Sequence, residues 1–448
     1  MSYEKWSWGY WTLKQYIKFA DWATHKKTII TGEEKIPDNK PIVFAPNHQN
    51  ALSDPMAILL NTHFQPVWLA RADIFGKSKT IDAILKFLKI MPVYRLRDGM
   101  ENLEKNEQTF ANSIKVLEHN SALALFPEAA HSAKRQMLVH KKAVPRIVFM
   151  AEEKTNNQLD IQIIPTGIYY SHYWKFNGTV IVNFGEPISV KQFLATHKQN
   201  QNAATIALKN EIYDAISPLT INIKSKKYYE EFERIRAVYG RHFLKRDNIK
   251  LSALNLFNSD QKLVNGLDKL EAAHPEEAEK AVNKAKQYAK LLRNYRLKSW
   301  LLDENQKHII KFLLSSIILL IGFPLFLYGF IFNAIPFFLI DRVTRKKIKD
   351  QSFWSTFFLV AGIVLFPIFY LLELLAVSWL IPGFWLKAGF LASLPFTGKI
   401  AFNWYILLRK NIGRCRLLVL KWFKKKTYNQ IKTSQKELFD LLDKHISN

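Results

Sequence analysis

The sequence predicts an α/β domain, followed by a helical extension and a C-terminal α-helical membrane region. Between residues 28 and 188, short β-rich runs alternate with helical stretches, which is typical of an α/β domain with a largely buried sheet. The residues that follow, up to residue 306, are highly charged and mostly helical in pattern. The final third contains long runs without a charged residue, as membrane segments do.

These regions divide the chain of 448 residues into five segments. Residues 1–27 are predicted to form an amphipathic helix, and residues 28–189 the α/β domain. Residues 190–306 are predicted to form the helical extension, residues 307–408 the membrane segments and residues 409–448 a basic cytoplasmic tail. A chain of this length holds two or three domains of roughly 100–200 residues each, so it can bury a sizeable core.

The N-terminal segment has aromatic residues at helical spacing. Residues spaced by three and four positions lie on one side of a helix. Here this series is Trp8, Trp11, Gln15, Phe19 and Trp22, so four aromatic rings would share one side. This pattern fits a helix that lies at a membrane interface, and it equally fits a helix packed on the core of its own domain. Lysines interrupt the apolar residues too early for a signal peptide, so we do not expect secretion.

The α/β domain is predicted from alternating short elements. Runs rich in aliphatic and aromatic residues predict strands at residues 41–45, 121–126, 161–164 and 180–184. Helices are predicted between them at residues 55–61, 81–90, 103–119 and 145–153. Because parallel strands are joined by helices, this order indicates a sheet with helices on its faces.

The membrane region has two uncharged blocks. Phe312–Ile340 is 29 residues without a charge, and Gln351–Leu372 is another 22. A bilayer crossing needs about 20 apolar residues, so we predict membrane segments in both blocks. Basic residues concentrate in the flanks, residues 341–350 and 409–426, and basic flanks stay in the cytoplasm.

With both flanks cytoplasmic, each block must return to its starting side. The block that continues to Leu408 can do so as two spans broken at Pro382 and Gly383. The first block, split at Gly322, gives arms of roughly 10 and 16 residues, too short for a core of about 30 Å. We therefore predict a re-entrant or in-plane hairpin there, with a single crossing as the alternative, and the α/β domain on the cytoplasmic face.

The composition limits the partners and cofactors. The net charge of +26 favours an anionic partner, either nucleic acid, an anionic membrane surface or an acidic ligand. Because the basic clusters flank the apolar blocks, lipid headgroups are preferred and nucleic acid is not expected. The single Cys415 excludes an internal disulfide framework and a cysteine-based zinc site. The sequence has no HExxH, Walker or GxGxxG pattern, so no metal and no nucleotide cofactor are expected.

A histidine and an aspartate follow the first predicted strand of this domain. His48 and Asp54 lie six positions apart at a strand end, the usual place for a site in an α/β sheet. If His48 lies in the loop, Asp54 can fix its tautomer and raise its basicity, so that it can deprotonate a hydroxyl. Alternatively, Asp54 or Ser53 is a helix N-cap and His48 is a polar loop residue.

Three further blocks follow in order. They are the turn with Arg95 and Arg97, the sequence Phe-Pro-Glu-Ala-Ala-His at residues 126–131, and a predicted strand end at Pro165. Together with His48 and Asp54, they resemble the four blocks of the glycerolipid acyltransferase family. The resemblance covers about residues 32–188, and four ordered blocks are far more specific than one.

The resemblance implies a role for each of these residues. His48 would be the general base and Asp54 its orienting carboxylate, while Arg95 or Arg97 would bind the phosphate of the acceptor. Glu128, His131 and Pro165 would belong to the substrate-binding site. The sequence also departs from the family. Five residues rather than four separate His48 from Asp54, and Ser53 stands at the usual aspartate position. Ala129 replaces a glycine, and an alanine would be strained if the backbone there has positive φ.

The resemblance also implies a reaction. An acyl chain would pass from an acyl-thioester, either acyl-CoA or acyl-carrier protein, to a hydroxyl of glycerol 3-phosphate or lysophosphatidic acid in phospholipid biosynthesis, without a cofactor. Backbone N–H groups near the start of the helix after His48 would stabilise the oxyanion. Dihydroxyacetone phosphate and a hydroxylated aminolipid are alternative acceptors. The alternative of another class is a catalytically degenerate basic scaffold that docks on anionic lipid.

Overall fold

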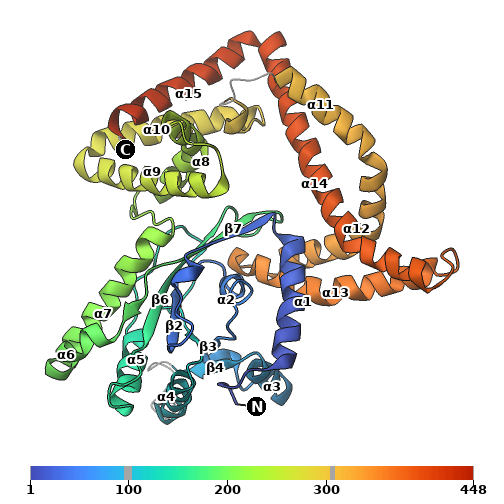
Figure 1. Cartoon of the computed structure of the whole chain (residues 1–448). Helices are drawn as coiled ribbons and strands as arrows, with labels where there is room; N and C mark the ends of the chain where they lie inside the picture. Colours follow the sequence, from blue (N-terminus) through green and yellow to red (C-terminus); the bar gives the residue numbers. More distant parts are fainter. Residues whose placement is uncertain (1, 95–102, 303–307, 447–448) are drawn as a thin grey trace. The chain divides into compact units, whose positions relative to one another are not determined.

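The computed structural model describes residues 2–94, 103–302 and 308–446 (Figure 1). The chain forms two compact units. The first, called the α/β unit here, contains Met1–Thr220 together with Asp350–Thr356. The second, called the helical unit, contains Ile221–Lys349 and Phe357–Asn448. A short segment from late in the sequence therefore folds with the N-terminal half of the chain.

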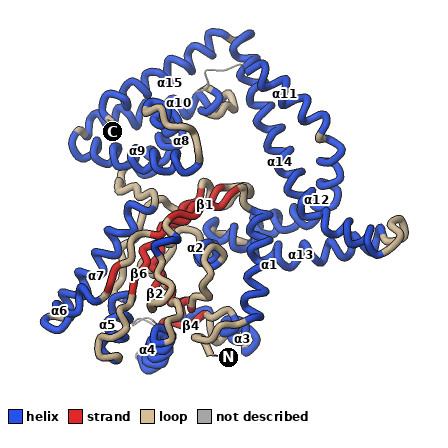
Figure 2. Tube along the Cα trace, in the orientation of Figure 1, coloured by secondary structure: helices blue, strands red, loops and turns tan. Residues whose placement is uncertain are grey.

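The α/β unit is built on one eight-stranded sheet, visible as the red strands of Figure 2. Along the sheet the order is β1-β7-β6-β2-β5-β3-β4, and β8 pairs with β6. The five strands from β6 to β4 are parallel to one another, whereas β7 and β8 run antiparallel to β6. The strands are β1 (Lys27–Thr31), β2 (Ile42–Pro46), β3 (Val67–Arg71), β4 (Ile90–Val93), β5 (Leu123–Ala124), β6 (Gln162–Tyr170), β7 (Thr179–Phe184) and β8 (Ile188–Ser189).

Hydrophobic side chains cover both faces of this sheet. Neighbouring residues of a strand point to opposite faces, so Val43 and Ile163 join one buried cluster, whereas Phe44 and Ile164 join another. The helices of the unit are α1 (Trp8–Thr24), α2 (Ser53–Leu59), α3 (Lys79–Phe87), α4 (Leu103–Glu118), α5 (Ala143–Lys154), α6 (Lys191–Gln199) and α7 (Gln201–Ile216). Helices α4, α5 and α7 supply residues to the first cluster, and α2 supplies residues to the second.

The predicted α/β architecture is confirmed, with one correction to a strand. We predicted that the third strand ends near Pro165, but β6 continues to Tyr170. Proline is tolerated in mid-strand because Pro165 lies between the residues that pair with β8 and those that pair with β7. Strands β1, β3, β4 and β8 were not predicted from the sequence.

The helical unit contains a group of packed charged helices. These are α8 (Tyr229–Arg246), α9 (Ala253–Ala273), α10 (Pro275–Asn294) and the C-terminal α15 (Lys425–His445). Asp443 of α15 accepts hydrogen bonds from Tyr239, His242 and Arg246 of α8. The end of the segment predicted as a basic tail thus folds together with part of the predicted helical extension.

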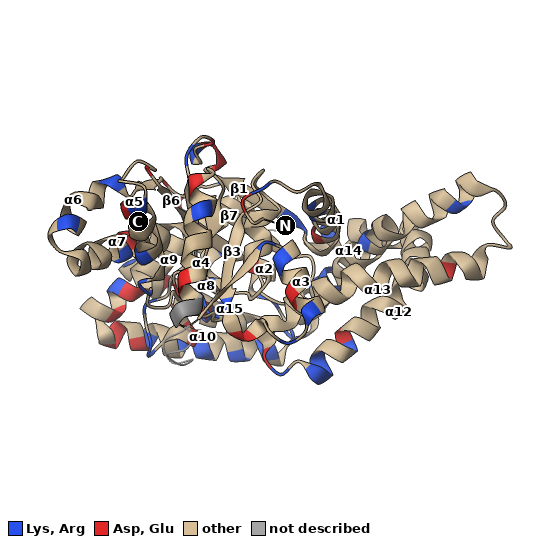
Figure 3. Ribbon diagram, turned by 90° about the horizontal axis from the view of Figure 1, so that it is seen from below, with Lys and Arg blue, Asp and Glu red and all other residues tan. Residues whose placement is uncertain are grey.

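The remaining helices of this unit are largely apolar. They are α11 (His308–Ile321), α12 (Phe323–Lys347), α13 (Trp354–Val377) and α14 (Phe384–Phe423). Two stretches of the described residues, Phe323–Lys347 and Gln351–Val377, are long and apolar enough to cross a membrane. Only 17% and 11% of their apolar windows are buried, and Figure 3 shows few charged residues along them. Their exposed apolar side chains need a lipid or protein environment.

The breaks between these helices agree with the sequence, and one helix is longer than the uncharged arm from which it was predicted. The first apolar block breaks at Gly322, and the second breaks between Val377 and Phe384 at Gly383, whose φ is +76°. The arm after Gly322, expected to be short, is a helix of 25 residues because it continues through the basic segment to Lys347. At 1.5 Å per residue it is about 37 Å long, enough for a crossing. The re-entrant path stays a prediction.

Candidate active site

The candidate site begins where β2 ends. Asn47 fixes the chain at this point, because its side-chain amide donates to the carbonyl oxygen of Ile168 at 3.1 Å and accepts from the Ile168 amide at 2.6 Å. The chain then turns away from the sheet, and His48 lies in the loop before α2. The loop placement allows His48 to reach Asp54, as the sequence analysis required.

His48 and Asp54 form a hydrogen-bonded pair. The distance from His48 Nδ1 to Asp54 Oδ2 is 2.8 Å. The same oxygen accepts backbone hydrogen bonds from Gln49 and Asn50, both at 2.7 Å. Asp54 is fully buried, whereas the His48 side chain is 15% exposed. Since a carboxylate only accepts, Nδ1 of His48 carries the hydrogen, and Nε2 keeps a lone pair that can take a proton.

Two alternatives from the sequence are decided by this geometry. The position before α2 is Leu52, and no side chain caps the helix there, so neither Ser53 nor Asp54 acts as its N-cap. The Ser53 hydroxyl instead bonds to Ser355. The structure therefore places Asp54, and not Ser53, against His48.

Three of the backbone N–H groups near the start of α2 are already engaged. The backbone N–H groups of Gln49 and Asn50 point to the carboxylate of Asp54. The N–H of Leu52 donates to the hydroxyl of Thr356 at 3.1 Å. These three groups hold the loop, so in this conformation they do not donate to a substrate.

Tyr170 is a further buried group beside Asp54. Burial, followed by the charge of the Asp54 carboxylate, raises the pKa of the Tyr170 hydroxyl well above its ordinary value. The hydroxyl therefore stays protonated next to the carboxylate at neutral pH. Sequence reasoning did not find Tyr170, because the residue lies at the end of a strand that we predicted to be shorter.

Glu128 joins the two loops of the site. Its Oε1 accepts from the backbone N–H of His48 at 3.2 Å, and its Oε2 accepts from that of Leu138 at 3.1 Å. The side chain is only 2% exposed, and burial raises the pKa of its carboxyl group to about 8. Glu128 thus holds the His48 loop against its own loop.

The Glu128 loop also carries two of the residues noted in the sequence. Ala129 has φ = +55°, so alanine occupies the left-handed conformation in which the family has glycine. The phenyl ring of Phe126 stacks on the His48 ring, with centroids 3.7 Å apart. The ring of His131 lies 5.4 Å from that of His48, and burial, more than the nearby His48, lowers the pKa of His131.

The comparisons with known proteins agree with this geometry. Residues 27–169, which contain β1, the His48 loop and the Glu128 loop, match the family model described as Acyltransferase. This part of the chain is an acyltransferase domain. The predicted resemblance to the glycerolipid acyltransferase family is thereby confirmed.

Two curated relatives are yeast enzymes. Glycerol-3-phosphate O-acyltransferase 1 of Saccharomyces cerevisiae is 26% identical over 248 residues, which are 54% of this chain and 32% of the relative. Glycerol-3-phosphate O-acyltransferase 2 of the same yeast is 22% identical over 211 residues, 43% of this chain and 26% of the relative. The match therefore spans less than a third of the length of each relative.

A solved structure is also similar to part of the chain. The 1-acyl-sn-glycerophosphate acyltransferase PlsC of Thermotoga maritima is 20% identical, with a TM-score of 0.32. The similarity covers 46% of this chain and 80% of PlsC.

The other predicted site residues of the acyltransferase domain are placed differently. Arg95 and Arg97 lie outside the described residues, two and four positions after β4 ends. Pro165 lies inside β6, where its carbonyl oxygen accepts from Gly185 at 2.8 Å, so it is not at the strand end that we predicted. Arg135, which follows the Glu128 block in the sequence, donates to the carbonyl oxygens of Tyr170 and Ser171 and is buried.

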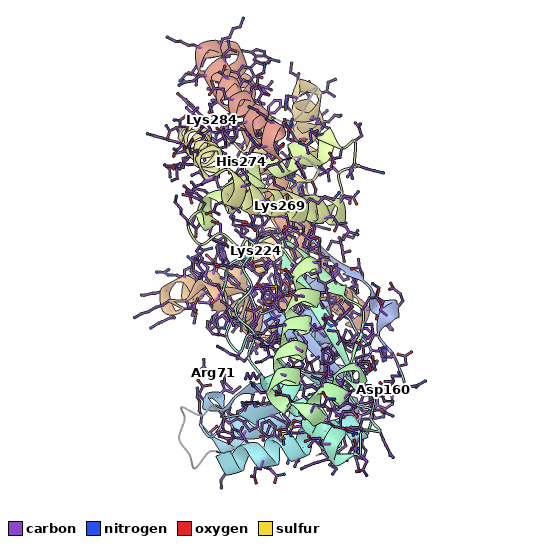
Figure 4. The ribbon with its side chains drawn as sticks, turned by 90° about the vertical axis from the view of Figure 1, so that its left-hand side faces the viewer. Arg71, Asp160, Lys224, Lys269, His274 and Lys284 are labelled. Carbon is purple, nitrogen blue, oxygen red and sulfur yellow. The ribbon has the colours of Figure 1, made fainter. Side chains whose placement is uncertain are left out.

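Arg71 is a site candidate that sequence reasoning missed. It ends β3, which lies between β5 and β4, so it emerges at the same edge of the sheet as the His48 and Glu128 loops. Figure 4 shows it on the side of the α/β unit opposite Asp160, which precedes β6. Arg71 forms an ion pair with Asp73 and contributes to the lowered pKa of His131. The signal was a β-rich run ending in arginine, which we did not assign to a strand.

The described part of the chain offers no evident metal centre. Among those residues, no group of three or more His, Cys, Asp or Glu side chains is placed to hold a metal ion. The expectation of a metal-free reaction remains a prediction.

Proposed function

We propose that this chain is a membrane-bound O-acyltransferase. It would move an acyl chain from acyl-CoA or acyl-carrier protein to a hydroxyl of glycerol 3-phosphate or lysophosphatidic acid. The observation that supports this most is the pair of His48 and Asp54, joined at 2.8 Å inside an acyltransferase domain. The two yeast relatives are glycerol-3-phosphate O-acyltransferases, which favours a glycerol-phosphate acceptor, although the match covers a minor part of their length.

The geometry supports direct transfer with His48 as general base. Nε2 of His48 takes the proton of the acceptor hydroxyl, while Asp54 stabilises the imidazolium that forms. The hydroxyl oxygen bonds to the thioester carbonyl carbon, giving a tetrahedral oxyanion. Collapse of this intermediate breaks the carbon–sulfur bond, and the proton on His48 passes to the leaving thiolate. The products are an ester and a thiol, and no cofactor takes part.

Arginine side chains that follow β3 and β4 in the sequence would hold the acceptor phosphate. Arg71 ends β3, and the stretch with Arg95 and Arg97 follows β4. The guanidinium group can donate two hydrogen bonds to one phosphate, so arginine suits this task better than lysine.

The N-terminal helix supports a position at the membrane surface. Its buried Lys14 donates to the carbonyl oxygens of Thr62 and Phe64, at 2.6 and 3.0 Å, which fixes α1 to the domain. The predicted aromatic face points outward, because Trp8, Trp11, Phe19 and Trp22 remain 41–73% exposed. Figure 1 shows α1 next to α3, whose Ile81 and Ile84 are also exposed. These side chains would enter the lipid headgroup region, with anionic lipids attracting nearby lysines.

The proposed reaction is tested with the purified full chain in detergent. Each acyl donor is combined with glycerol 3-phosphate, lysophosphatidic acid, dihydroxyacetone phosphate or a hydroxylated aminolipid, and thiol release and lipid product are measured. We expect acylation of a glycerol-phosphate acceptor that His48→Ala abolishes. Exclusive use of another acceptor would change the substrate, and no transfer to any acceptor would favour the scaffold alternative.

The proposed orientation is tested by cysteine labelling in a Cys415→Ser background. Lys346→Cys and Asn429→Cys replace exposed residues of the basic segments, and Leu380→Cys replaces an exposed residue between α13 and α14. An impermeant thiol reagent added outside intact cells should label only the last variant. Labelling of Lys346→Cys from outside would place the basic loop, and with it the proposed catalytic face, on the wrong side.

A further inference from the structure

The segment Asp350–Thr356 follows the first stretch that is long and apolar enough to cross a membrane and includes the first six residues of the second, Gln351–Val377, yet it folds with the α/β unit. It contains the short 3₁₀ helix Gln351–Phe353 and the first three residues of α13. Its polar side chains bond to the two loops of the candidate site. This pattern is unexpected for a simple connection between membrane helices, whose polar groups would face water.

Three hydrogen bonds join the segment to the His48 loop. The hydroxyl of Ser355 donates to Asn50 Oδ1 at 2.7 Å and accepts from the hydroxyl of Ser53 at 3.1 Å. The hydroxyl of Thr356 accepts from the backbone N–H of Leu52 at 3.1 Å. Asn50 is also one of the two backbone donors to Asp54, so Ser355 bonds to a residue that orients the carboxylate.

A second set of contacts reaches His131. Ser352 Oγ donates to Asp350 Oδ1 at 2.5 Å, so it can accept from His131 Nε2, which lies 3.2 Å away. The phenyl ring of Phe353 stands edge-on to the His131 ring, with centroids 4.9 Å apart. These contacts fix the tautomer and the plane of a histidine whose ring is 5.4 Å from His48.

We propose that Asp350–Thr356 is a positioning segment of the acyltransferase site, which holds the His48 loop through Ser355 and Thr356 and orients His131 through Ser352. This inference rests on the proposed function for its effect on turnover, but its contacts are measurable without it. The segment supplies no reacting group. It makes the geometry of the site depend on the part of the chain that enters the membrane.

The docking is tested by cross-linking in the Cys415→Ser background. Ser53→Cys combined with Ser355→Cys should form a disulfide under mild oxidation, because the two side-chain oxygens are 3.1 Å apart. The matched control pairs Ser53→Cys with Ser378→Cys, just after the other end of α13, where the hydroxyl donates to the carbonyl oxygen of Leu375. A cross-link in the control but not in the test pair, or in neither, would overturn the docking.

The effect on the loop is measured by hydrogen exchange of residues 47–56 in the full chain. Ser355→Ala should speed exchange there, whereas Ser378→Ala should leave it at the wild-type rate. In the acyltransferase assay, Ser355→Ala should lower kcat by roughly two- to tenfold for each hydrogen bond lost, with little change in acceptor KM. Ser355→Thr keeps the hydroxyl and should restore both the slow exchange and the turnover.

A double-mutant cycle tests the second set of contacts. If Ser352 acts through His131, Ser352→Ala lowers kcat in the wild-type background but has no further effect in a His131→Ala background. Additive effects, or unchanged exchange and kcat in Ser355→Ala, would overturn the positioning role. A wild-type chain that forms the cross-link but transfers no acyl group would contradict the proposed function and leave the docking in place.

Discussion

Asp54→Asn isolates the electrostatic part of the proposed mechanism. Asp54 Oδ2 accepts three hydrogen bonds, from His48 Nδ1 and from two backbone N–H groups, and the residue is fully buried. Asparagine has nearly the same shape and keeps one oxygen for these donors. An alanine would instead leave the two backbone N–H groups buried without acceptors, at a cost of about 1–3 kcal/mol each.

The three bonds make different contributions. Hydrogen bonds to a charged group are worth about 1.5–3 kcal/mol and neutral ones about 0.5–1.5 kcal/mol, so each of the two backbone bonds weakens by about 1 kcal/mol. We therefore expect the free energy of unfolding to fall by about 2 kcal/mol. The bond to His48 acts on the rate, because the carboxylate stabilises the imidazolium. Losing about 1.5–3 kcal/mol there lowers kcat roughly 10- to 150-fold.

The assay measures kcat with one acceptor, and denaturant unfolding of the same samples gives the free energy of unfolding. Asp160→Asn is the matched control, since Asp160 pairs with Lys40 and Lys191 before β6, at the opposite edge of the sheet, and should keep full turnover. His48→Ala should lose about 10²–10⁴-fold, and adding Asp54→Asn to it should change nothing further. Wild-type turnover in Asp54→Asn, or an undiminished effect in the His48→Ala background, would refute the reasoning.

Three other predictions concern the loops and the acceptor. Ala129→Gly removes a side chain from a backbone at φ = +55°, so it should raise the free energy of unfolding by about 1 kcal/mol and leave turnover unchanged; a lower stability would show that the alanine is not strained. Glu128 has a pKa raised to about 8 by burial, so between pH 5 and 8 the folded chain holds a proton that the unfolded chain releases, and stability should fall as the pH rises. Glu128→Gln cannot titrate and loses one backbone hydrogen bond, so at pH 5.5 its free energy of unfolding should be about 1–3 kcal/mol lower than that of the wild type. Thermal unfolding at pH 8 should show a smaller difference. Arg71→Ala should raise the acceptor KM by roughly 10- to 150-fold with the donor KM unchanged, whereas Lys40→Ala at the opposite edge should alter neither; an unchanged acceptor KM would leave the phosphate to Arg95 and Arg97.

The sequence predicted those parts of the fold whose pattern is local. The strand before His48, the helices near residues 55, 81, 103 and 145, and the break at Gly322 all follow from hydrophobic periodicity or from glycine and proline. Strands β3 and β4 were not assigned from the sequence, and β6 was cut at Pro165 because proline usually ends a strand. What permits that proline is the position of β7 and β8, which is not local.

The site shows the same limit. The spacing of His48 and Asp54 suggested a pair. Only the structure, in which Asn47 fixes the bend after β2, shows that the two side chains form a hydrogen bond. Glu128 was expected to contact the acceptor, whereas in the structure both its oxygens accept backbone hydrogen bonds. The contacts of Ser355 join positions about three hundred residues apart, and no local pattern in the sequence could have revealed them.

The α/β unit is formed by two separate parts of the sequence, which has a consequence for how the protein folds during synthesis. During synthesis, residues 1–220 leave the ribosome first, and residues 221–349 must follow before Asp350–Thr356 is made. At about 5–20 residues per second this takes several seconds, during which the sheet can fold but the hydroxyl partners of the His48 loop do not yet exist. The last piece follows the first apolar stretch and forms the beginning of the second. The nascent chain would therefore gain its finished site only as the second of these stretches emerges from the ribosome.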